Sequence, residues 1–292
     1  MKTYGEYLSE IFHGQKVQKI SVDAGFTCPN RDGTRGSGGC IYCRNDSFSP
    51  SYCDSKESIS NQISRGKAFF ARKYPEMKFL AYFQSYTGTY LNDVSKLELL
   101  YREALKDDKV VGLVVATRPD SISDEALNLL ADINCEKPVF IELGAETSND
   151  TTLRLINRNH TWSDVIDATT RIGSKDLHCG IHLICGLPGE GEKEILQTVA
   201  DTIKLPIETI KLHQLQVLLD TPLHNKMIAG EISVPNFTLE EYLQLCVKIV
   251  RMVPSHIVIE RFLSQSPPEM VVSPSWGLKN YEFMAKLEHL LS

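Results

Sequence analysis

The sequence lacks the marks of a membrane-bound or exported protein. No apolar run approaches the roughly 20 residues that a bilayer-spanning helix needs. The amino-terminal segment has no small-residue cleavage site of the kind that ends a signal peptide. An excess of positive charge is also missing, because 31 Lys and Arg stand against 37 Asp and Glu, a net charge of −6. We therefore expect a cytoplasmic protein with no membrane partner. Its overall charge does not mark it as a nucleic-acid binder, although a local basic groove is compatible with it.

Internal repeats, low-complexity tracts and an obvious interdomain linker are missing as well. What the 292 residues contain is 42% hydrophobic side chains, in strand-type runs that alternate with amphipathic segments. Strands separated by helices predict right-handed βαβ units and a parallel sheet. The number of units favours an α/β fold with a partial or nearly closed parallel (β/α) barrel over a flat doubly wound sheet. We expect one domain over residues 1–292, with a core at about 17–260 and a carboxyl-terminal extension at 261–292. The predicted strands are Val17–Val22, Phe79–Gln84, Val110–Ala116, Val139–Leu143, His178–Cys185, Thr209–Val217 and His256–Glu260.

Polar residues mark the starts of several predicted helices. A different composition follows the last predicted strand, where Ser264–Trp276 is rich in Pro and Ser and predicts a loop across one end of the barrel. The helix starts are expected at Asn92-Asp93, Ser123-Asp124-Glu125, Ser148-Asn149-Asp150 and Ser163-Asp164.

Eight cysteines are present, and three of them crowd into one glycine-rich loop. The other five stand alone in apolar or mixed segments, as buried reduced thiols do. Cys28, Cys40 and Cys43 follow the first predicted strand, on the face where α/β barrels build their active sites. In a reducing compartment such a group indicates metal binding rather than disulfides.

Two kinds of metal centre compete for this loop. Zinc normally takes four protein ligands, and the additional candidates, Cys53 and His13, have no tight spacing to the three cysteines. Three thiolates without a fourth ligand fit a 4Fe–4S cluster that leaves one iron open. The iron–sulfur interpretation is therefore favoured, and zinc is the alternative.

The cysteine loop resembles that of the radical S-adenosylmethionine (radical SAM) superfamily. Its first cysteine spacing is lengthened as in the YhcC-like group and, more distantly, in the catalytic subunit of Elongator. Tyr42 matches the aromatic residue that usually precedes the last cysteine. The resemblance implies a 4Fe–4S cluster on Cys28, Cys40 and Cys43, whose open iron chelates S-adenosylmethionine. It also implies an external one-electron reductant of the flavodoxin or ferredoxin type.

The ends of the second and third strands resemble the superfamily too. Residues 82–91 stand where its members contact the amino group of S-adenosylmethionine, which implies roles for Gln84 and Thr87, although the usual glycines are replaced. At the end of the third strand Thr117, Arg118 and Asp120 take pocket positions, while the acidic residue of some relatives is replaced by Ala116. Ordinary polar turns are the alternative for both segments.

The fourth and fifth units match over longer stretches. Residues 141–161 resemble the "ELG-Q … NRGHT" pattern of Elongator-type enzymes. This implies that Arg158 pairs with the cofactor carboxylate and that Glu146 and Glu142 lie near the cofactor, with a buried salt bridge as the alternative for Glu142. Residues 178–190 resemble an "H-x-x-x-GLPGE" strand end, which implies cofactor contacts at His182 and Leu187.

Substrate-side residues are expected on the sixth strand, where Lys211 and His213 alternate toward one face and are the catalytic candidates. Arg261 and Trp276 follow later, where they either close the substrate end or cap the barrel. The resemblance to Elongator implies a transfer RNA substrate and modification of its wobble uridine. The basic and aromatic stretch at 65–74 is a candidate phosphate contact, with the solvated face of an amphipathic helix as the alternative.

Three other functions stay open on the sequence alone. One is a radical SAM enzyme that acts on a small molecule or a peptide. Another is a non-catalytic iron–sulfur or zinc module that binds RNA or a protein. The last is a zinc-dependent hydrolase that uses His178, His182 and a carboxylate, although these histidines also fit satisfied core residues.

Overall fold

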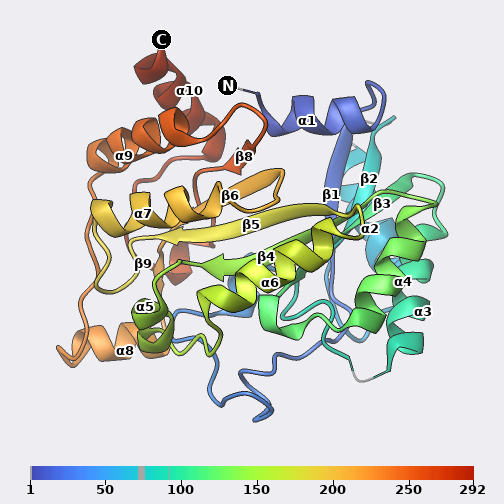
Figure 1. Ribbon diagram of the computed structural model, residues 1–292, viewed down its shortest axis with the longest axis horizontal. Coiled ribbons are helices and arrows are strands. Elements are labelled where there is room, and N and C mark those ends of the chain that lie inside the picture. The colour runs from blue at the N-terminus through green and yellow to red at the C-terminus, as the bar shows by residue number, and fades with distance from the viewer. Residues whose placement is uncertain (1, 72–75, 92) are drawn as a thin grey trace.

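Seven parallel strands form one continuous sheet in the order β1-β2-β3-β4-β5-β6-β8 (Figure 1). The computed structural model describes residues 2–71, 76–91 and 93–292. Consecutive strands of this sheet are neighbours in space, and at least one helix lies between each pair along the chain. The strands are β1 (Val17–Val22), β2 (Lys78–Phe83), β3 (Val110–Thr117), β4 (Val139–Glu146), β5 (His178–Cys185), β6 (Thr209–Gln214) and β8 (Val258–Arg261).

Most of the helices surround this sheet, and short 3-10 turns follow some strands (Figure 1). The helices are α1 (Tyr4–Ile11), α2 (Ile59–Ala71), α3 (Val94–Leu105), α4 (Asp124–Asn134), α5 (Asp150–Leu155), α6 (Trp162–Gly173), α7 (Glu192–Thr202), α8 (Pro222–Ile228), α9 (Leu239–Met252) and α10 (Asn280–Leu291). The 3-10 turns are η1 (Asn45–Phe48), η2 (Pro119–Ser121) and η3 (Pro268–Met270), and a separate two-stranded sheet pairs β7 (Val217–Leu218) with β9 (Val271–Ser273).

The seven-stranded sheet curls until its two edges approach each other. Lys19 on the edge strand β1 reaches Glu260 on the opposite edge strand β8, with 2.7 Å between Nζ and Oε2. The short helix α1 contacts both edge strands. This curled half-barrel confirms the predicted α/β fold with a partial parallel barrel.

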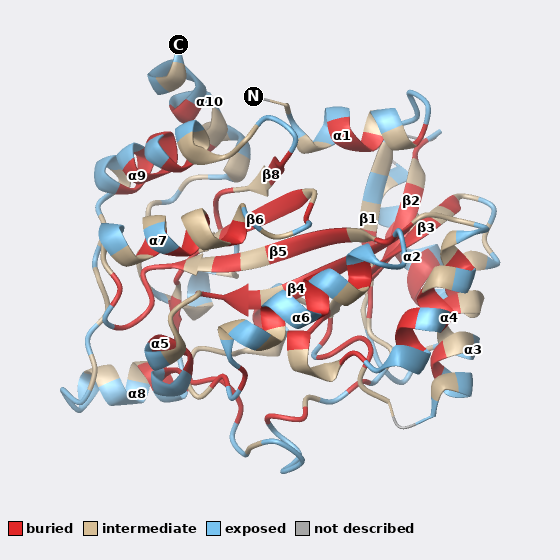
Figure 2. Cartoon of the chain, viewed as in Figure 1, coloured by how far each residue is buried: buried red, intermediate tan, exposed pale blue. Residues whose placement is uncertain are grey.

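Two apolar clusters hold the layers together, one on each face of the sheet. The larger cluster joins one set of alternate strand residues, such as Leu113 and Ile141, to the surrounding helices. The smaller cluster lies inside the curl, where Tyr7 and Phe12 pack against Phe140. Burial is accordingly densest along the strands and on the helix sides that face them (Figure 2). The inner face is therefore apolar at the amino end of the strands, and the carboxyl end is left for polar side chains.

Several local predictions are confirmed. The strands at Val17–Val22 and His178–Cys185 have the predicted bounds. Asp93, Ser123 and Asn149 are the N-caps of α3, α4 and α5, and each accepts a hydrogen bond from a backbone N–H of the first turn.

Several local predictions were wrong. The fourth strand runs to Glu146 rather than Leu143, and the last strand is Val258–Arg261 rather than His256–Glu260. The sixth strand ends at Gln214 rather than Val217, because Val217 and Leu218 leave the sheet and pair with β9. The predicted loop 264–276 contains that partner strand and η3. Helix α6 begins earlier than Ser163, because Thr161 is its N-cap and forms a capping box with Asp164.

Among the residues that the structure describes, no helix is long and apolar enough to span a bilayer.

Candidate active site

A cavity of about 390 Å³ opens at the carboxyl ends of the strands. Its walls come from the loop after β1, from the ends of β2 to β6, and from the segment after β8. Because all seven strands run parallel, their carboxyl ends meet at one edge of the half-barrel. The cavity is therefore where residues that are far apart in the sequence converge.

The three cysteines of the long loop line this cavity together, and all three are free thiols. Asn30, which is fully buried, fixes the loop by donating one amide hydrogen bond to Cys40 Sγ at 3.6 Å and one to the backbone oxygen of Asn157. Asn157 donates in return to the Gly39 carbonyl at 2.8 Å. The long loop between Cys28 and Cys40 thus folds back onto the segment after α5, and that segment carries Arg158.

The surroundings of the three cysteines differ from those of the other candidate metal ligands. Within the described ranges, no three His, Cys, Asp or Glu side chains are grouped closely enough to hold one metal ion, although three thiols line one cavity. Burial, with Cys40 adding to it, raises the pKa of the Cys43 thiol to about 11, so a thiolate there needs a cationic centre beside it. Cys53, an alternative zinc ligand, instead donates to the Ser21 carbonyl at 3.1 Å. His13 lies before β1, at the amino end of the strands.

Arg158 connects the cysteine loop to the end of β4. Its Nη2 lies 3.1 Å from Glu146 Oε1 and donates to the Gly144 carbonyl at 2.6 Å, while Nη1 lies 3.7 Å from Cys40 Sγ. Both charged residues are buried. Glu146 has a φ of 68°, a left-handed conformation that is unusual for a residue other than Gly and costs backbone energy. Such strain at a polar cavity is typical of a functional position.

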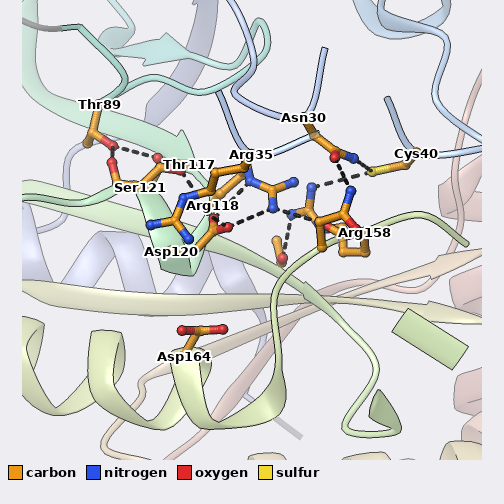
Figure 3. Close-up of polar contacts among 12 residues, drawn as sticks. Asn30, Arg35, Cys40, Thr89, Thr117, Arg118, Asp120, Ser121, Arg158 and Asp164 are labelled. Carbon is orange, nitrogen blue, oxygen red and sulfur yellow. Dashed lines mark hydrogen bonds and ion pairs between the residues drawn. The ribbon is translucent and has the colours of Figure 1, made fainter. Parts of the chain in front are cut away.

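Arg118 extends this polar chain toward β3. It is 1% exposed, and its Nε and Nη2 donate to the Asp120 carboxylate at 2.8 and 2.9 Å (Figure 3). Nη2 also donates to the Arg158 carbonyl at 2.7 Å. Figure 3 shows Thr89 in contact with Thr117 and Ser121, and separately the contacts that lead from Arg118 through Arg158 to Cys40. Arg118 is therefore held by Asp120, which does not line the cavity. Arg158 is held by Glu146, Gly144 and Cys40, which line the cavity themselves.

The floor of the cavity is a buried ionic network centred on Glu142. Lys19 and Lys211 both pair with Glu142 and with Glu260, and His182 Nε2 donates to Glu142 at 2.7 Å. Burial alone would raise the pKa of the Glu142 carboxyl, but Lys19, Lys211 and His182 outweigh burial and hold that pKa well below its usual range. Burial and then the Lys211 ammonium lower the pKa of His182, which is therefore a neutral donor. The network carries two ammonium groups and two carboxylates.

His213 and Arg261 form a second polar wall. Arg261 Nη2 donates to His213 Nδ1 at 3.0 Å. Burial, and then the Arg261 guanidinium, hold the pKa of His213 well below its usual range.

Among the described residues, buried polar atoms without a partner concentrate at this cavity. Buried side-chain nitrogens and oxygens are nearly always paired in a native fold, so an unpaired group at a cavity is a candidate contact for a water molecule or a polar ligand. The cavity-lining residues with such atoms are Thr87 (Oγ1), Arg118 (Nη1), Arg158 (Nε), His213 (Nε2), Gln216 (Oε1) and Arg261 (Nε).

Comparison with known protein families shows which family the chain belongs to. Residues 30–202 match the family model for the radical SAM superfamily, and residues 207–292 match the model for the radical SAM C-terminal domain. The chain belongs to the radical SAM superfamily. It is therefore an enzyme of a family whose members bind a 4Fe–4S cluster and S-adenosylmethionine and need a reductant. The two family models meet between β5 and β6, but the sheet is continuous across this boundary because β6 pairs with β5 and β8 pairs with β6.

Individual relatives agree with the superfamily assignment. Protein YhcC of Escherichia coli K12 is 34% identical over 281 residues, which cover 96% of this chain and 89% of YhcC. A tRNA uridine(34) acetyltransferase of Methanocaldococcus jannaschii is 23% identical over 66% of this chain and 36% of its own length. The structure of the archaeal Elp3 of Methanocaldococcus infernus has the same fold, with a TM-score of 0.69 at 16% identity, over 94% of this chain and 63% of that chain.

Most of the residues predicted for the radical SAM site meet at the cavity. Three predicted residues do not line it: Asp120 pairs with Arg118, Leu187 is fully buried in an apolar cluster, and Lys211 lies in the ionic network beneath the cavity. Those that line it are Cys28, Cys40, Cys43, Tyr42, Gln84, Thr87, Thr117, Arg118, Glu142, Glu146, Arg158, His182 and His213.

The sequence reasoning missed other residues of the radical SAM site. Asn30 supports Cys40, and Gln216 and Ser264 line the cavity. Asn30 lies two residues after Cys28, so its place inside the cysteine loop was the sequence signal for it. Ser264 begins the segment that was predicted to cross one end of the barrel, whereas Gln216 was assigned to the sixth strand, which ends at Gln214.

His178 and His182, the candidate zinc ligands, lie in different surroundings. His178 Nδ1 lies 2.7 Å from Glu208 and its ring stacks on Phe140, near the amino end of the sheet. His182 belongs to the network beneath the cavity. The two histidines share the inner face, as their spacing on β5 predicts, but they have different partners.

Proposed function

We propose that the protein cleaves S-adenosylmethionine reductively at a 4Fe–4S cluster on Cys28, Cys40 and Cys43 and acts on a wobble uridine of transfer RNA. One observation supports the first part most directly: three free cysteines open onto the same cavity as the Glu146–Arg158 pair. When bound, the cluster and S-adenosylmethionine supply a 5′-deoxyadenosyl radical that removes a hydrogen atom from the substrate.

The chain itself positions and shields these groups. Asn30 and Arg158 approach Cys40 Sγ from two sides, at 3.6 and 3.7 Å, and orient that ligand. The unpartnered Arg158 Nε is a free donor for an anionic group such as the cofactor carboxylate. Helix α1 and the Glu142 network close the half-barrel beneath the cavity and keep water away from it.

The electron enters from outside the chain in this proposal. Residues 31–35 of the cysteine loop are exposed, so a flavodoxin- or ferredoxin-type reductant has access to the loop that carries the cluster ligands.

The rim of the cavity supports an RNA substrate. Arg31 and Arg44 line the opening, although Arg44 also pairs with Asp46 at 3.1 Å. Phe48 and Tyr86 line it with exposed rings. Cations and exposed aromatic rings at one opening are typical of sites that bind phosphates and stack unpaired bases. The similarity to the tRNA uridine(34) acetyltransferase extends over two thirds of this chain and agrees with this choice.

The predicted basic stretch at 65–74 supports this choice less. Arg65 pairs with Glu57 at 3.1 Å, and Lys67 pairs with Asp107, so both charges are satisfied within the chain. Residues 72–74 of that stretch lie outside the described residues.

The substrate proposal is tested with unmodified transfer RNA and the reconstituted enzyme under anaerobic conditions. We expect transfer RNA deuterated in its uridines to pass deuterium to 5′-deoxyadenosine, and mass spectrometry of digested RNA to show a changed nucleoside. A transcript with cytidine at the wobble position is the control and is expected to give neither signal. Deuterium transfer from both transcripts would exclude that uridine. Transfer from neither, while a deuterated peptide or small metabolite passes deuterium to 5′-deoxyadenosine, would replace RNA as the substrate.

A further inference from the structure

The wall that joins β6 to β8 carries two unused hydrogen-bond donors. A guanidinium group has no acceptor, so the 3.0 Å contact between Arg261 Nη2 and His213 Nδ1 makes Nδ1 the acceptor. The neutral His213 ring therefore carries its proton on Nε2. Both His213 Nε2 and Arg261 Nε are buried without a partner, and both residues line the cavity.

The carboxylates nearest this wall are engaged by other side chains. Glu142 and Glu260 are both shared by Lys19 and Lys211. In the part of the chain that the structure describes, Arg261 pairs with no carboxylate, and its hydrogen-bond partner is the neutral His213. A cation that lines a cavity in this way favours an anionic ligand.

We propose that His213 and Arg261 form a subsite for an oxyanion of the substrate, the phosphate of the nucleotide that presents the target base. The subsite rests on the proposed function, since it deepens the choice of RNA as substrate. Arg261 supplies a charged donor and His213 a neutral one, and phosphate oxygens, which an RNA substrate carries, accept from both kinds of donor. Gln216, whose amide also lines the cavity, lies two residues beyond β6 and adds a polar group to the same wall.

The test measures binding rather than turnover. Reconstituted enzyme saturated with S-adenosylmethionine is titrated with uridine 5′-monophosphate, and separately with uridine, by equilibrium dialysis. In Arg261→Gln we expect the Kd for uridine 5′-monophosphate to rise at least about tenfold, because a hydrogen bond to a charged group is lost. The Kd for uridine is expected to stay unchanged. Arg261→Lys keeps the charge but loses the guanidinium contact with His213, so its Kd for uridine 5′-monophosphate is expected to lie between those of the wild type and Arg261→Gln.

Matched variants separate the subsite from general damage. Arg251→Gln removes an exposed arginine at the end of α9 and is expected to bind all ligands as the wild type does. His213→Gln is expected to weaken uridine 5′-monophosphate several-fold without changing the affinity for S-adenosylmethionine. Thermal unfolding of each variant shows that the fold is intact.

Four outcomes overturn the subsite. They are no binding of uridine 5′-monophosphate to the wild type, equal binding by Arg261→Gln, a parallel loss of S-adenosylmethionine in the variants, and displacement of the nucleotide by acetate as readily as by inorganic phosphate. The parallel loss would assign the donors to the cofactor, and the acetate result would assign them to a carboxylate substrate. Release of 5′-deoxyadenosine is measured in the same samples, so a failure of the radical chemistry is seen separately from a failure of the subsite.

Discussion

Glu142 shows how one residue organises the centre of the molecule. It is 4% exposed, yet it accepts hydrogen bonds from Lys19, Lys211, His182 and Tyr82. A buried carboxylate is stable only when such partners compensate for the lost hydration. The sequence left two interpretations of Glu142 open, a cofactor contact and a buried salt bridge, and the structure gives it the salt bridges while it still lines the cavity.

Replacing this carboxylate tests the network. In Glu142→Gln the two lysines keep Glu260 as their shared carboxylate, so we expect the free energy of unfolding to fall by about 3 kcal/mol. Urea denaturation measures the change. Glu98→Gln is the control, because Glu98 forms an exposed ion pair with Arg102 and is expected to change stability by less than about 0.5 kcal/mol. Equal effects of the two substitutions would show that the network does not stabilise the fold.

The same network predicts a dependence of stability on acid. The pKa values of Glu142 and Glu260 are lowered in the folded protein, because the neighbouring lysines outweigh the effect of burial. A lowered carboxyl pKa contributes stability that is present above the ordinary value of about 4.3 and is lost as the pH falls from there toward the folded value. We expect the unfolding free energy to drop below about pH 4 and to drop less in Glu142→Gln. Parallel profiles for wild type and variant would contradict this.

Gly144 is required by the close approach of Arg158. A Cβ atom at this position would lie 2.6 Å from Arg158 Nη2 and 2.8 Å from Glu146 Oε1. We expect Gly144→Ala to displace Arg158 and to weaken S-adenosylmethionine binding by about tenfold, since a hydrogen bond to a charged group contributes roughly 1.5–3 kcal/mol. Calorimetric titration of the reconstituted protein measures it. Gly173→Ala, whose added Cβ would meet Pro206 at an ordinary 3.6 Å, is the control and is expected to bind normally.

At the scale of elements, the sequence predicted the strands better than the segments that connect them. Hydrophobic runs between polar helix starts defined β1 and β5 to the residue, and the alternation of strands and helices predicted a parallel barrel. The sixth strand was predicted too long because Val217 and Leu218 continue its apolar pattern, although they pair with β9. That pairing joins residues more than fifty positions apart, which local periodicity does not report.

In the candidate site, too, positions at strand ends were predicted better than the directions of individual side chains. Residues at the carboxyl ends of strands were found because parallel strands bring those ends together. Leu187 and Lys211 were expected at the cofactor and the substrate, but packing directs one into an apolar cluster and the other into the ionic network. Side-chain direction near a strand end depends on neighbouring segments, and the sequence pattern alone does not define it.

The docking of the cysteine loop gives a prediction for iron binding. Asn30 joins Cys40 to the backbone of Asn157, so Asn30→Ala removes the buried amide that holds the loop against Arg158. We expect the variant to fold and to retain less iron and sulfide after reconstitution than the wild type. Asn61→Ala, an exposed change on α2, is the control and is expected to retain both. Normal iron content in Asn30→Ala would show that the loop is held by its backbone alone.

At the scale of the whole molecule, the chain is an enzyme built around one edge of one sheet. The half-barrel places the cysteine loop, the Glu146–Arg158 pair and the β6–β8 wall around a single cavity. Residues 207–292 complete this arrangement, since β6 and β8 supply His213 and Arg261. The cavity therefore combines the cysteine site, with Cys40 and Cys43 in residues 30–202, and the proposed substrate subsite in residues 207–292, the two parts that the family models match.

The central claim is tested most directly by the release of 5′-deoxyadenosine from S-adenosylmethionine. The protein is purified without oxygen, reconstituted with iron and sulfide, and reduced with dithionite. We expect release by the wild type, none by Cys43→Ala, and release at the wild-type level by Cys135→Ala, which changes an exposed cysteine after α4. Equal release by the wild type and Cys43→Ala, or zinc in place of iron at the three cysteines, would contradict the account.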